Sequence, residues 1–248
     1  MGDGYPEIGL AKGQTIVKNT RMENIVMILS ISLLTLVEPM CTLKPARHEK
    51  RILFFGDSIT ELGIKPNGYI TLLQKQLKPE YPALELIGAG ISGHKVPDLL
   101  ARLQRDVLDR QPTTVVIYIG VNDVWHSVLP GHYGTPRDEY RDGLIRIIRS
   151  IKSIGARVIL CTPSVIGEKP DGSNPLDPLL EEYAQISRNV AAAENIKLCD
   201  LRRAFIDYLK ANNPEMLSEG ILTYDGVHLS DAGNRFVADR MLEVLESD

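Results

Sequence analysis

The sequence predicts an α/β fold with a mainly parallel five-stranded sheet, and two features of the chain support this prediction. From Arg51 onward, short apolar runs rich in β-branched residues alternate with longer segments of helical period, which is typical of repeated β–α units. The first run stops abruptly at Gly-Asp-Ser-Ile-Thr, as a buried strand does when it delivers a polar residue at its end. The expected strands are 52–55, 84–87, 114–119, 157–160 and 197–199.

The segments between these strands carry ordinary signals for the start and end of helices. Thr135 precedes a proline and stands three residues before Asp138, which is a capping pattern, and apolar residues then recur on one face up to Gly155. Ser230 is the expected cap of a final helix that runs through residue 245. Further helices are expected near 69–77, 97–108, 179–193 and 201–210.

Length and composition favour one globular domain. The chain has 248 residues, of which 44% are hydrophobic, and we expect the domain at 51–248 behind an extension at 1–50. The net charge of −4 and the scattered Lys and Arg residues provide no basic surface, so nucleic acid is not an expected partner. None of the three cysteines has CxxC spacing; we expect Cys161 and Cys199 to be buried thiols, although a pair between neighbouring strands is conceivable.

The N-terminal extension resembles an export signal. Residues 25–37 are mostly apolar and follow Lys18 and Arg21, and this run is shorter than the roughly 20 residues of a membrane span but typical of a signal peptide. We therefore expect a periplasmic or secreted protein without a stable membrane span in its mature domain. A cytoplasmic location, membrane anchoring or a short apolar helix beside the domain stay open as alternatives. Residues 43–50 are polar and basic, as in a linker.

Three residues, one near the start of the expected domain and two near its end, form a candidate catalytic triad. Ser58 follows the first strand, and ligands of open α/β sheets bind beyond the carboxyl ends of the strands. Serine is a weak nucleophile until a histidine accepts its proton, and that histidine works best when a carboxylate orients it. Asp225-Gly-Val-His228 supplies both groups.

Acyl transfer from a serine also needs donors for the oxyanion of the tetrahedral intermediate. The amide of Asn122, directly after the third strand, would point into the same crevice as Ser58. The glycine-rich segment 88–93 follows the second strand, where missing side chains allow backbone N–H groups to approach a ligand. The Ser58 N–H, at a turn from strand to helix, is the third expected donor.

The order and content of four blocks resemble the SGNH (GDSL-type) hydrolase superfamily over about 52–245. The blocks are 56–60, 90–93, 120–123 and 225–228. The resemblance implies a three-layer αβα sandwich of flavodoxin-like type and an esterase or lipase activity that uses no metal and no cofactor. In the second block, related sequences often have Asn and Asp where this chain has Gly88 and His94, which affects the local hydrogen bonding of that loop.

Carried over to this chain, the resemblance assigns roles to five residues. Ser58 is the nucleophile and donates its own N–H, Gly93 and Asn122 complete the oxyanion hole, His228 is the base, and Asp225 orients it. Each block alone is a weak signal, but four in the right order are specific.

Three neighbouring residues are expected to support the site. Asp57 is the expected organiser of the loop before Ser58, and Asp123 either supports the site or caps the turn after the third strand. Trp125 is either core or a platform for a sugar or acyl group, and Tyr224 carries the same two interpretations. His94 and His126 either line the cleft or belong to loops.

The preferred substrate is a short-chain ester, acetyl above all, of a carbohydrate or small alcohol, since no apolar tract outside the core predicts a long acyl channel. A lysophospholipase, a thioesterase and a catalytically silent module that binds glycan or lipid are the alternatives. The literal GxGxxG at 88–93 also describes a dinucleotide-binding turn, but no acidic residue ends the next strand to bind a ribose. A metal hydrolase is disfavoured because the histidines lack HExxH or i,i+4 spacing.

Overall fold

The five expected strands form one parallel sheet. A computed structural model describes residues 50–247, in which the strands pair in the order β2-β1-β3-β4-β5. Every pairing is parallel, with Phe55 beside Ala89 on one side and Ile117 on the other. The strands are β1 (Arg51–Gly56), β2 (Glu85–Gly90), β3 (Thr114–Tyr118), β4 (Arg157–Cys161) and β5 (Lys197–Cys199).

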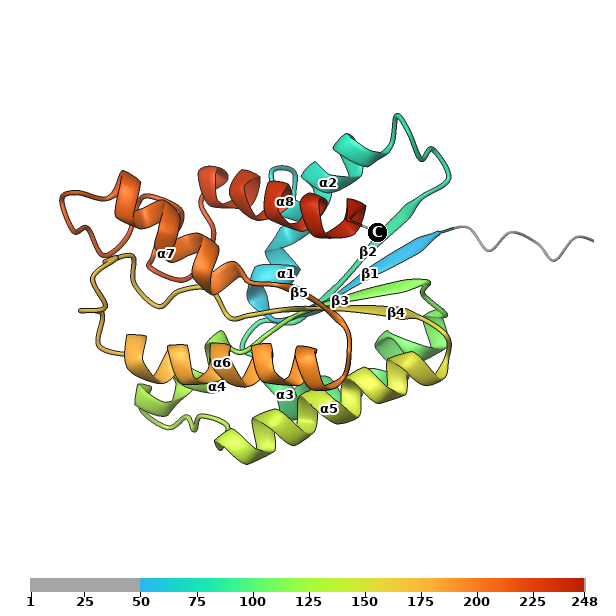
Figure 1. Ribbon diagram of the computed structural model, residues 1–248, viewed down its shortest axis with the longest axis horizontal. Helices are drawn as coiled ribbons and strands as arrows, with labels where there is room; N and C mark the ends of the chain where they lie inside the picture. Colours follow the sequence, from blue (N-terminus) through green and yellow to red (C-terminus); the bar gives the residue numbers. More distant parts are fainter. Residues whose placement is uncertain (1–49, 248) are drawn as a thin grey trace, which may run out of the picture. The chain divides into compact units, whose positions relative to one another are not determined.

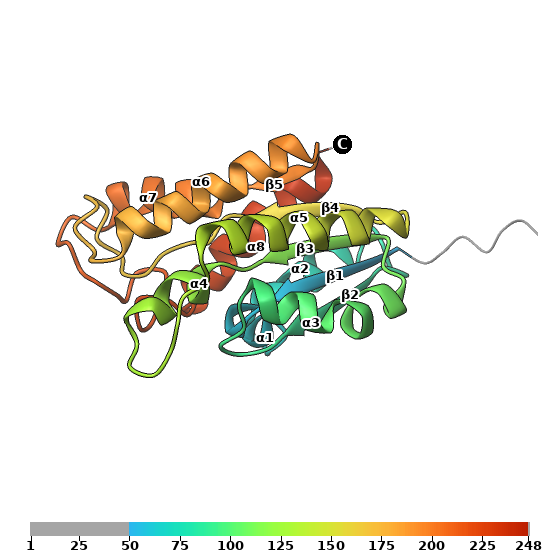
Figure 2. The same cartoon turned by 90° about the horizontal axis from the view of Figure 1, so that it is seen from below.

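Helices cover both faces of the sheet, which confirms the three-layer αβα prediction (Figures 1 and 2). One face carries α1 (Ser58–Gly63), α2 (Tyr69–Leu77), α7 (Leu201–Asn212) and α8 (Asp231–Glu246). The other carries α3 (Val96–Asp106), α5 (Arg137–Ser153) and α6 (Asp177–Ala193). The shorter helices are η1 (Leu108–Arg110), α4 (Val121–Trp125) and η2 (His126–Val128).

The alternation of side chains along β1 explains why both faces need cover. Phe54 and Phe55 are fully buried on opposite faces, the first in the core beneath α2, α7 and α8 and the second in the core beneath α3, α5 and α6. Strands of this kind are apolar along their whole length because neither face meets water.

Two expectations about local structure were wrong. Thr135 does not cap α5: its backbone N–H donates to the Asp123 carbonyl at 2.9 Å, and the helix begins at Arg137 behind Pro136. The expected second strand ended too early, because Gly88 to Gly90 belong to β2 rather than to a donor loop. Gly90 is required by packing, since a Cβ there would lie 2.1 Å from the backbone N of Glu61 in α1.

The apolar run at 25–37 lies outside the described residues, and so does Cys41. Within 50–247, none of the helices is long and apolar enough to cross a membrane. Cys161 and Cys199 are buried free thiols, as expected, and face each other in register on β4 and β5.

Candidate active site

The order of the strands brings the sequence blocks together. Ser58 follows β1, Gly93 follows β2 and Asn122 follows β3, and these three strands are neighbours with β1 in the centre. Because the strands are parallel, their carboxyl ends meet at the same edge of the sheet. His228 reaches this edge from the segment before α8, 170 residues along the chain from Ser58.

A continuous chain of hydrogen bonds joins Ser58, His228 and Asp225. The Ser58 Oγ lies 2.9 Å from the His228 Nε2, and the His228 Nδ1 lies 2.6 Å from the Asp225 Oδ2. A carboxylate can only accept, so Nδ1 carries the ring proton and Nε2 is free to accept from the Ser58 hydroxyl. This is the arrangement in which a histidine can remove the proton of a serine.

Asp225 is held in place and kept charged by its own loop. Its Oδ1 accepts the backbone N–H of Val227 at 3.0 Å and of His228 at 2.7 Å. Partial burial opposes ionisation, but the hydrogen bonds from His228 and from the backbone outweigh it and lower the pKa of Asp225. Asp225 is therefore a carboxylate at neutral pH.

Ser58 is the first residue of α1 and does not cap that helix. Asp57 is the cap, and its Oδ1 accepts the Ile59 N–H at 3.0 Å. The Ser58 hydroxyl is thus left for His228. Burial raises the pKa of Asp57 to about 7, with a further contribution from the nearby carboxylate of Asp123. Asp57 therefore fixes the first turn of the helix that begins with Ser58.

Gly93 belongs to the loop 91–94 after β2, and Asn122 of α4 is hydrogen-bonded to the same loop. Asn122 is 4% exposed, and its Nδ2 donates one N–H to the His94 carbonyl at 3.1 Å, which leaves the second N–H of the amide for a ligand. Gly93 is exposed and has a φ of +78°, a conformation that favours glycine.

The loop 91–94 is held from several sides. The Glu61 carboxylate on α1 accepts the Ser92 N–H at 2.7 Å and the Ser92 hydroxyl at 2.5 Å. The hydrogen bond from the Ser92 side chain lowers the pKa of Glu61. The loop beside Gly93 is therefore fixed to the helix that carries Ser58.

Asp123 supports the start of α3. Its Oδ1 accepts the Val96 N–H at 3.1 Å. Burial raises the pKa of Asp123 to about 6. The side chain is 1% exposed and bonds to the neighbouring element, so it supports the architecture around the loop 91–94.

Two aromatic rings flank His228. Tyr224 is stacked nearly parallel to the imidazole at 5.8 Å and is 57% exposed, and Trp125 meets it edge-on at 6.4 Å. Trp125 is half-buried and packs against the core as well. His126 is tilted against His132 at 4.9 Å, and its ring is the nearest side chain to the position of a Cβ on Gly93. Tyr224, Trp125 and His126 therefore border the site.

A role at the site for Arg102, a buried residue of α3, was not predicted from the sequence. Its guanidinium donates to the Gly56 carbonyl at 2.7 Å, to the Ala89 carbonyl at 2.9 Å and to the His94 Nδ1 at 3.1 Å. It therefore ties the ends of β1 and β2 to the loop 91–94. A signal was present, because Arg102 falls on the apolar face of the 97–108 helix, where a charge is unusual.

Known proteins resemble this chain in sequence and in fold. Residues 54–236 match the model of the GDSL-like Lipase/Acylhydrolase family. The chain belongs to this family. The predicted superfamily is thereby confirmed, and as a GDSL-type protein the chain is a carboxylic ester hydrolase.

Relatives of this GDSL-type protein include several proteins named as esterases. An acetylxylan esterase of Geobacillus stearothermophilus is 32% identical over 215 residues, which cover 78% of this chain and 92% of the relative. The crystal structure of an acetyl xylan esterase named AlAXEase is 47% identical with a TM-score of 0.76, and the match covers 78% of this chain and 98% of that one. An isoamyl acetate-hydrolyzing esterase 1 homolog of Rattus norvegicus is 28% identical over 209 residues, covering 79% and 81%.

Proposed function

We propose that this protein removes acetyl groups from esters of carbohydrates through an acyl-enzyme on Ser58. The observation that carries the proposal is the chain of two hydrogen bonds, 2.9 Å and 2.6 Å, from Ser58 through His228 to Asp225. The acetylxylan esterases among its relatives support the choice of acyl group and alcohol.

The proposed reaction has two similar halves. His228 takes the proton of Ser58, whose Oγ attacks the ester carbonyl, and the resulting oxyanion is bound by the N–H groups of Ser58, Gly93 and Asn122. The carbonyl then re-forms, the alcohol leaves with the proton from His228, and an acetyl group remains on Ser58. Water, activated by His228, attacks this acyl-enzyme in the same way and releases acetate.

The surroundings of His228 support a carbohydrate as the alcohol. Tyr224 presents an exposed ring beside the imidazole, and a tyrosine ring offers a sugar an apolar face together with a polar hydroxyl.

A cavity of about 730 Å³ in the described part of the chain is lined by Leu77, Tyr81 and Arg157 and not by Ser58. That cavity is therefore not an extension of the proposed site.

The test is hydrolysis of p-nitrophenyl esters from acetate to decanoate, and of acetylated xylo-oligosaccharides, by the wild type and by Ser58→Ala. We expect activity that falls with acyl length, disappears in the variant and survives EDTA, because the proposed chemistry uses no metal ion. Equal activity of Ser58→Ala would contradict the proposal. A preference for long acyl chains would favour a lysophospholipase or thioesterase instead.

We also propose that residues 1–50 direct export of the hydrolase domain at 51–248. The support is the apolar run at 25–37 behind Lys18 and Arg21. Cell fractionation with N-terminal sequencing of the recovered protein tests this. We expect the domain outside the cytoplasm, whereas recovery of the full chain in the cytoplasm would contradict export.

A further inference from the structure

Glu168 is a fully buried carboxylate in the loop between β4 and α6, and it binds the segment that leads to Asp225 and His228. It is 0% exposed. Its Oε2 accepts the Ile221 N–H at 2.7 Å, and its Oε1 accepts the Leu222 N–H at 2.6 Å and the Thr223 N–H at 2.7 Å. Hydrogen bonds to a charged acceptor are stronger than neutral ones, so three of them fix this stretch of backbone.

The backbone on either side of Glu168 binds the same segment. The Gly167 N–H donates to the Gly226 carbonyl at 2.8 Å, and the Glu168 N–H donates to the Ser218 carbonyl at 2.9 Å. The Glu168 carbonyl in turn accepts from the Asn213 Nδ2 at 2.8 Å. The loop after β4, drawn in gold, and the segment before α8 are thus joined at one end of the sheet (Figure 1).

The segment has little regular secondary structure, although backbone hydrogen bonds such as that from the Tyr224 N–H to the His228 carbonyl at 3.0 Å close its turns. Between α7 and α8, its β-structure is a single isolated bridge from Thr223 to Leu229. Inside it, the Thr223 Oγ1 accepts the Gly226 N–H at 3.1 Å, and Asp225 and His228 follow within five residues. The backbone that Glu168 binds is therefore the base on which these two side chains are placed.

We propose that Glu168 is a positioning residue that sets His228 in line between Ser58 and Asp225. This inference rests on the proposed function of that triad. Glu168 touches none of the reacting atoms; it acts through the backbone of 221–223. A displacement of about 1 Å at a reacting group can cost about 100-fold in rate, so loss of this anchor should be visible in kcat.

The decisive variant is Glu168→Gln. Glutamine keeps the size of the side chain but replaces one acceptor oxygen with a donor, which would face a backbone N–H. We expect kcat for p-nitrophenyl acetate to fall by about 10- to 100-fold. KM should stay within about twofold of the wild type, because Ser58, Gly93 and Asn122 are not bound by Glu168.

If Glu168 only stabilised the fold, its replacement would leave the hydrogen bond between His228 and Asp225 unchanged. We therefore also follow the downfield proton resonance of His228 Nδ1, which we expect to weaken or shift in Glu168→Gln. The matched control is Ser187→Ala, which removes a fully buried hydroxyl bonded to Tyr140 at 2.9 Å on the opposite face of the sheet. It should lose stability but keep kcat and the His228 resonance.

All variants are assayed well below their own melting temperatures, beside Ser58→Ala. Wild-type kcat and an unchanged His228 resonance in Glu168→Gln, with Ser58→Ala inactive, would overturn the role of Glu168 and leave the proposed function standing. Full activity of Ser58→Ala would overturn both. If Glu168→Gln does not fold, Glu168→Asp, which keeps the charge on a shorter side chain, replaces it under the same criteria.

Discussion

Gly93 presents its backbone N–H from a left-handed conformation in an exposed loop. Nothing crowds the position of its missing Cβ, where the nearest atom, from His126, lies 3.9 Å away. Position 93 therefore needs glycine because its backbone is left-handed, and not because a side chain would clash with a neighbour. Gly155, which follows α5, has the same conformation with a φ of +80° and open space around it.

These two glycines allow a matched comparison. Alanine at either position costs about 1–2 kcal/mol of stability because its Cβ disfavours a left-handed backbone. Only Gly93→Ala should reduce kcat, because relief of that strain turns the N–H away from the oxyanion. Urea titration and ester hydrolysis of Gly93→Ala and Gly155→Ala check this. Equal kcat in the two variants would remove the Gly93 N–H from the oxyanion hole.

Among single residues, Ser58 and Asn122 could be placed from the sequence because each directly follows a predicted strand. Asp225 was found because it stands in the last of the four ordered blocks. Glu61 and Glu168 could not be predicted, because a lone charged residue in a helix or loop has no periodic or spacing signal. Their roles depend on which backbone N–H groups tertiary packing brings within reach.

At the level of elements, the N-terminal cap of α1 is the buried carboxyl of Asp57, and burial favours its protonated form. The pKa of Asp57 is raised from its ordinary 3.8 to about 7, mainly by burial. Between these two values the folded state holds a proton that the unfolded state has lost. The free energy of unfolding therefore falls as pH rises through this window, by at most about 1.4 kcal/mol per pH unit from this group.

Asp57→Asn tests this dependence. Its side-chain oxygen can still accept the Ile59 N–H, but it carries no charge at any pH. We expect the stability of the variant relative to the wild type to increase from pH 5 to pH 8 in urea titrations. Asp207→Asn, at an exposed position of α7, serves as the control and should show no such trend. A parallel pH dependence of Asp57→Asn and wild type would contradict burial of an ionisable Asp57.

The elements themselves differ in how well the sequence predicts them. The helix α2 was predicted at the bounds observed, because its apolar residues keep a 3.6-residue period. The end of β2 was misplaced because glycines are a turn signal in a sequence. In the structure these glycines belong to β2, and because they have no side chains, α1 can pack directly on the strand.

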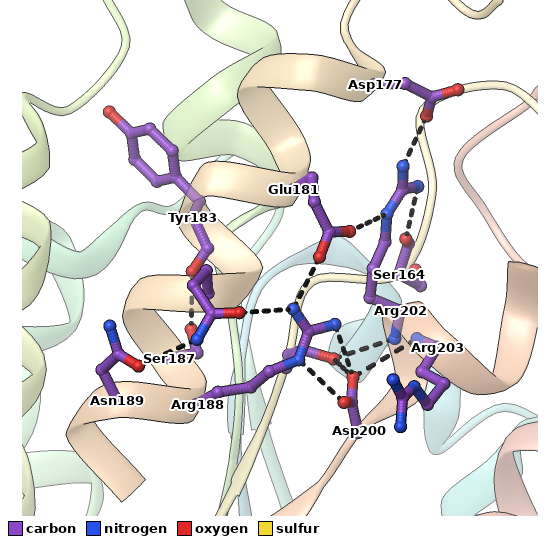
Figure 3. A network of polar contacts seen from close by, with 12 residues as sticks. Ser164, Asp177, Glu181, Tyr183, Ser187, Arg188, Asn189, Asp200, Arg202 and Arg203 are labelled. Carbon is purple, nitrogen blue, oxygen red and sulfur yellow. Dashed lines mark hydrogen bonds and ion pairs between the residues drawn. The ribbon is translucent and has the colours of Figure 1, made fainter. Parts of the chain in front are cut away.

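At the scale of the whole molecule, a network of charges joins the two helical layers at the β5 edge of the sheet (Figure 3). Arg202 of α7 is 3% exposed, and its Nη2 lies 2.7 Å from the Asp177 Oδ1 and its Nε 3.3 Å from the Glu181 Oε2, both on α6. Arg188 of α6 pairs with Asp200, the cap of α7, at 2.8 Å. The network also includes the Ser164 carbonyl, at the start of the loop that carries Glu168.

Removal of Arg202 should therefore destabilise the molecule as a whole. Arg202→Met leaves Asp177 buried without its ion-pair partner, which costs about 3–5 kcal/mol. Arg203→Met changes the next, exposed residue of the same helix and should have an effect near zero. Urea denaturation of both variants measures the difference. Similar stabilities would show that the network contributes little to joining the layers.

The fold could be predicted because a parallel sheet buried on both faces leaves a repeating pattern of apolar runs along the chain. What could not be predicted is how segments far apart are tied together. The contacts of Arg102, Glu168 and Arg202 join residues up to 55 positions apart and follow from the packed structure.

The most direct test of the account is covalent trapping of its nucleophile. A fluorophosphonate is attacked by an activated serine, whose oxygen displaces fluoride and stays bonded to phosphorus. We predict one adduct per chain, located on Ser58 by peptide mass spectrometry, that forms in step with the loss of acetate release and is absent from Ser58→Ala. An adduct on another residue, or continued hydrolysis by fully labelled protein, would contradict Ser58 as the catalytic nucleophile.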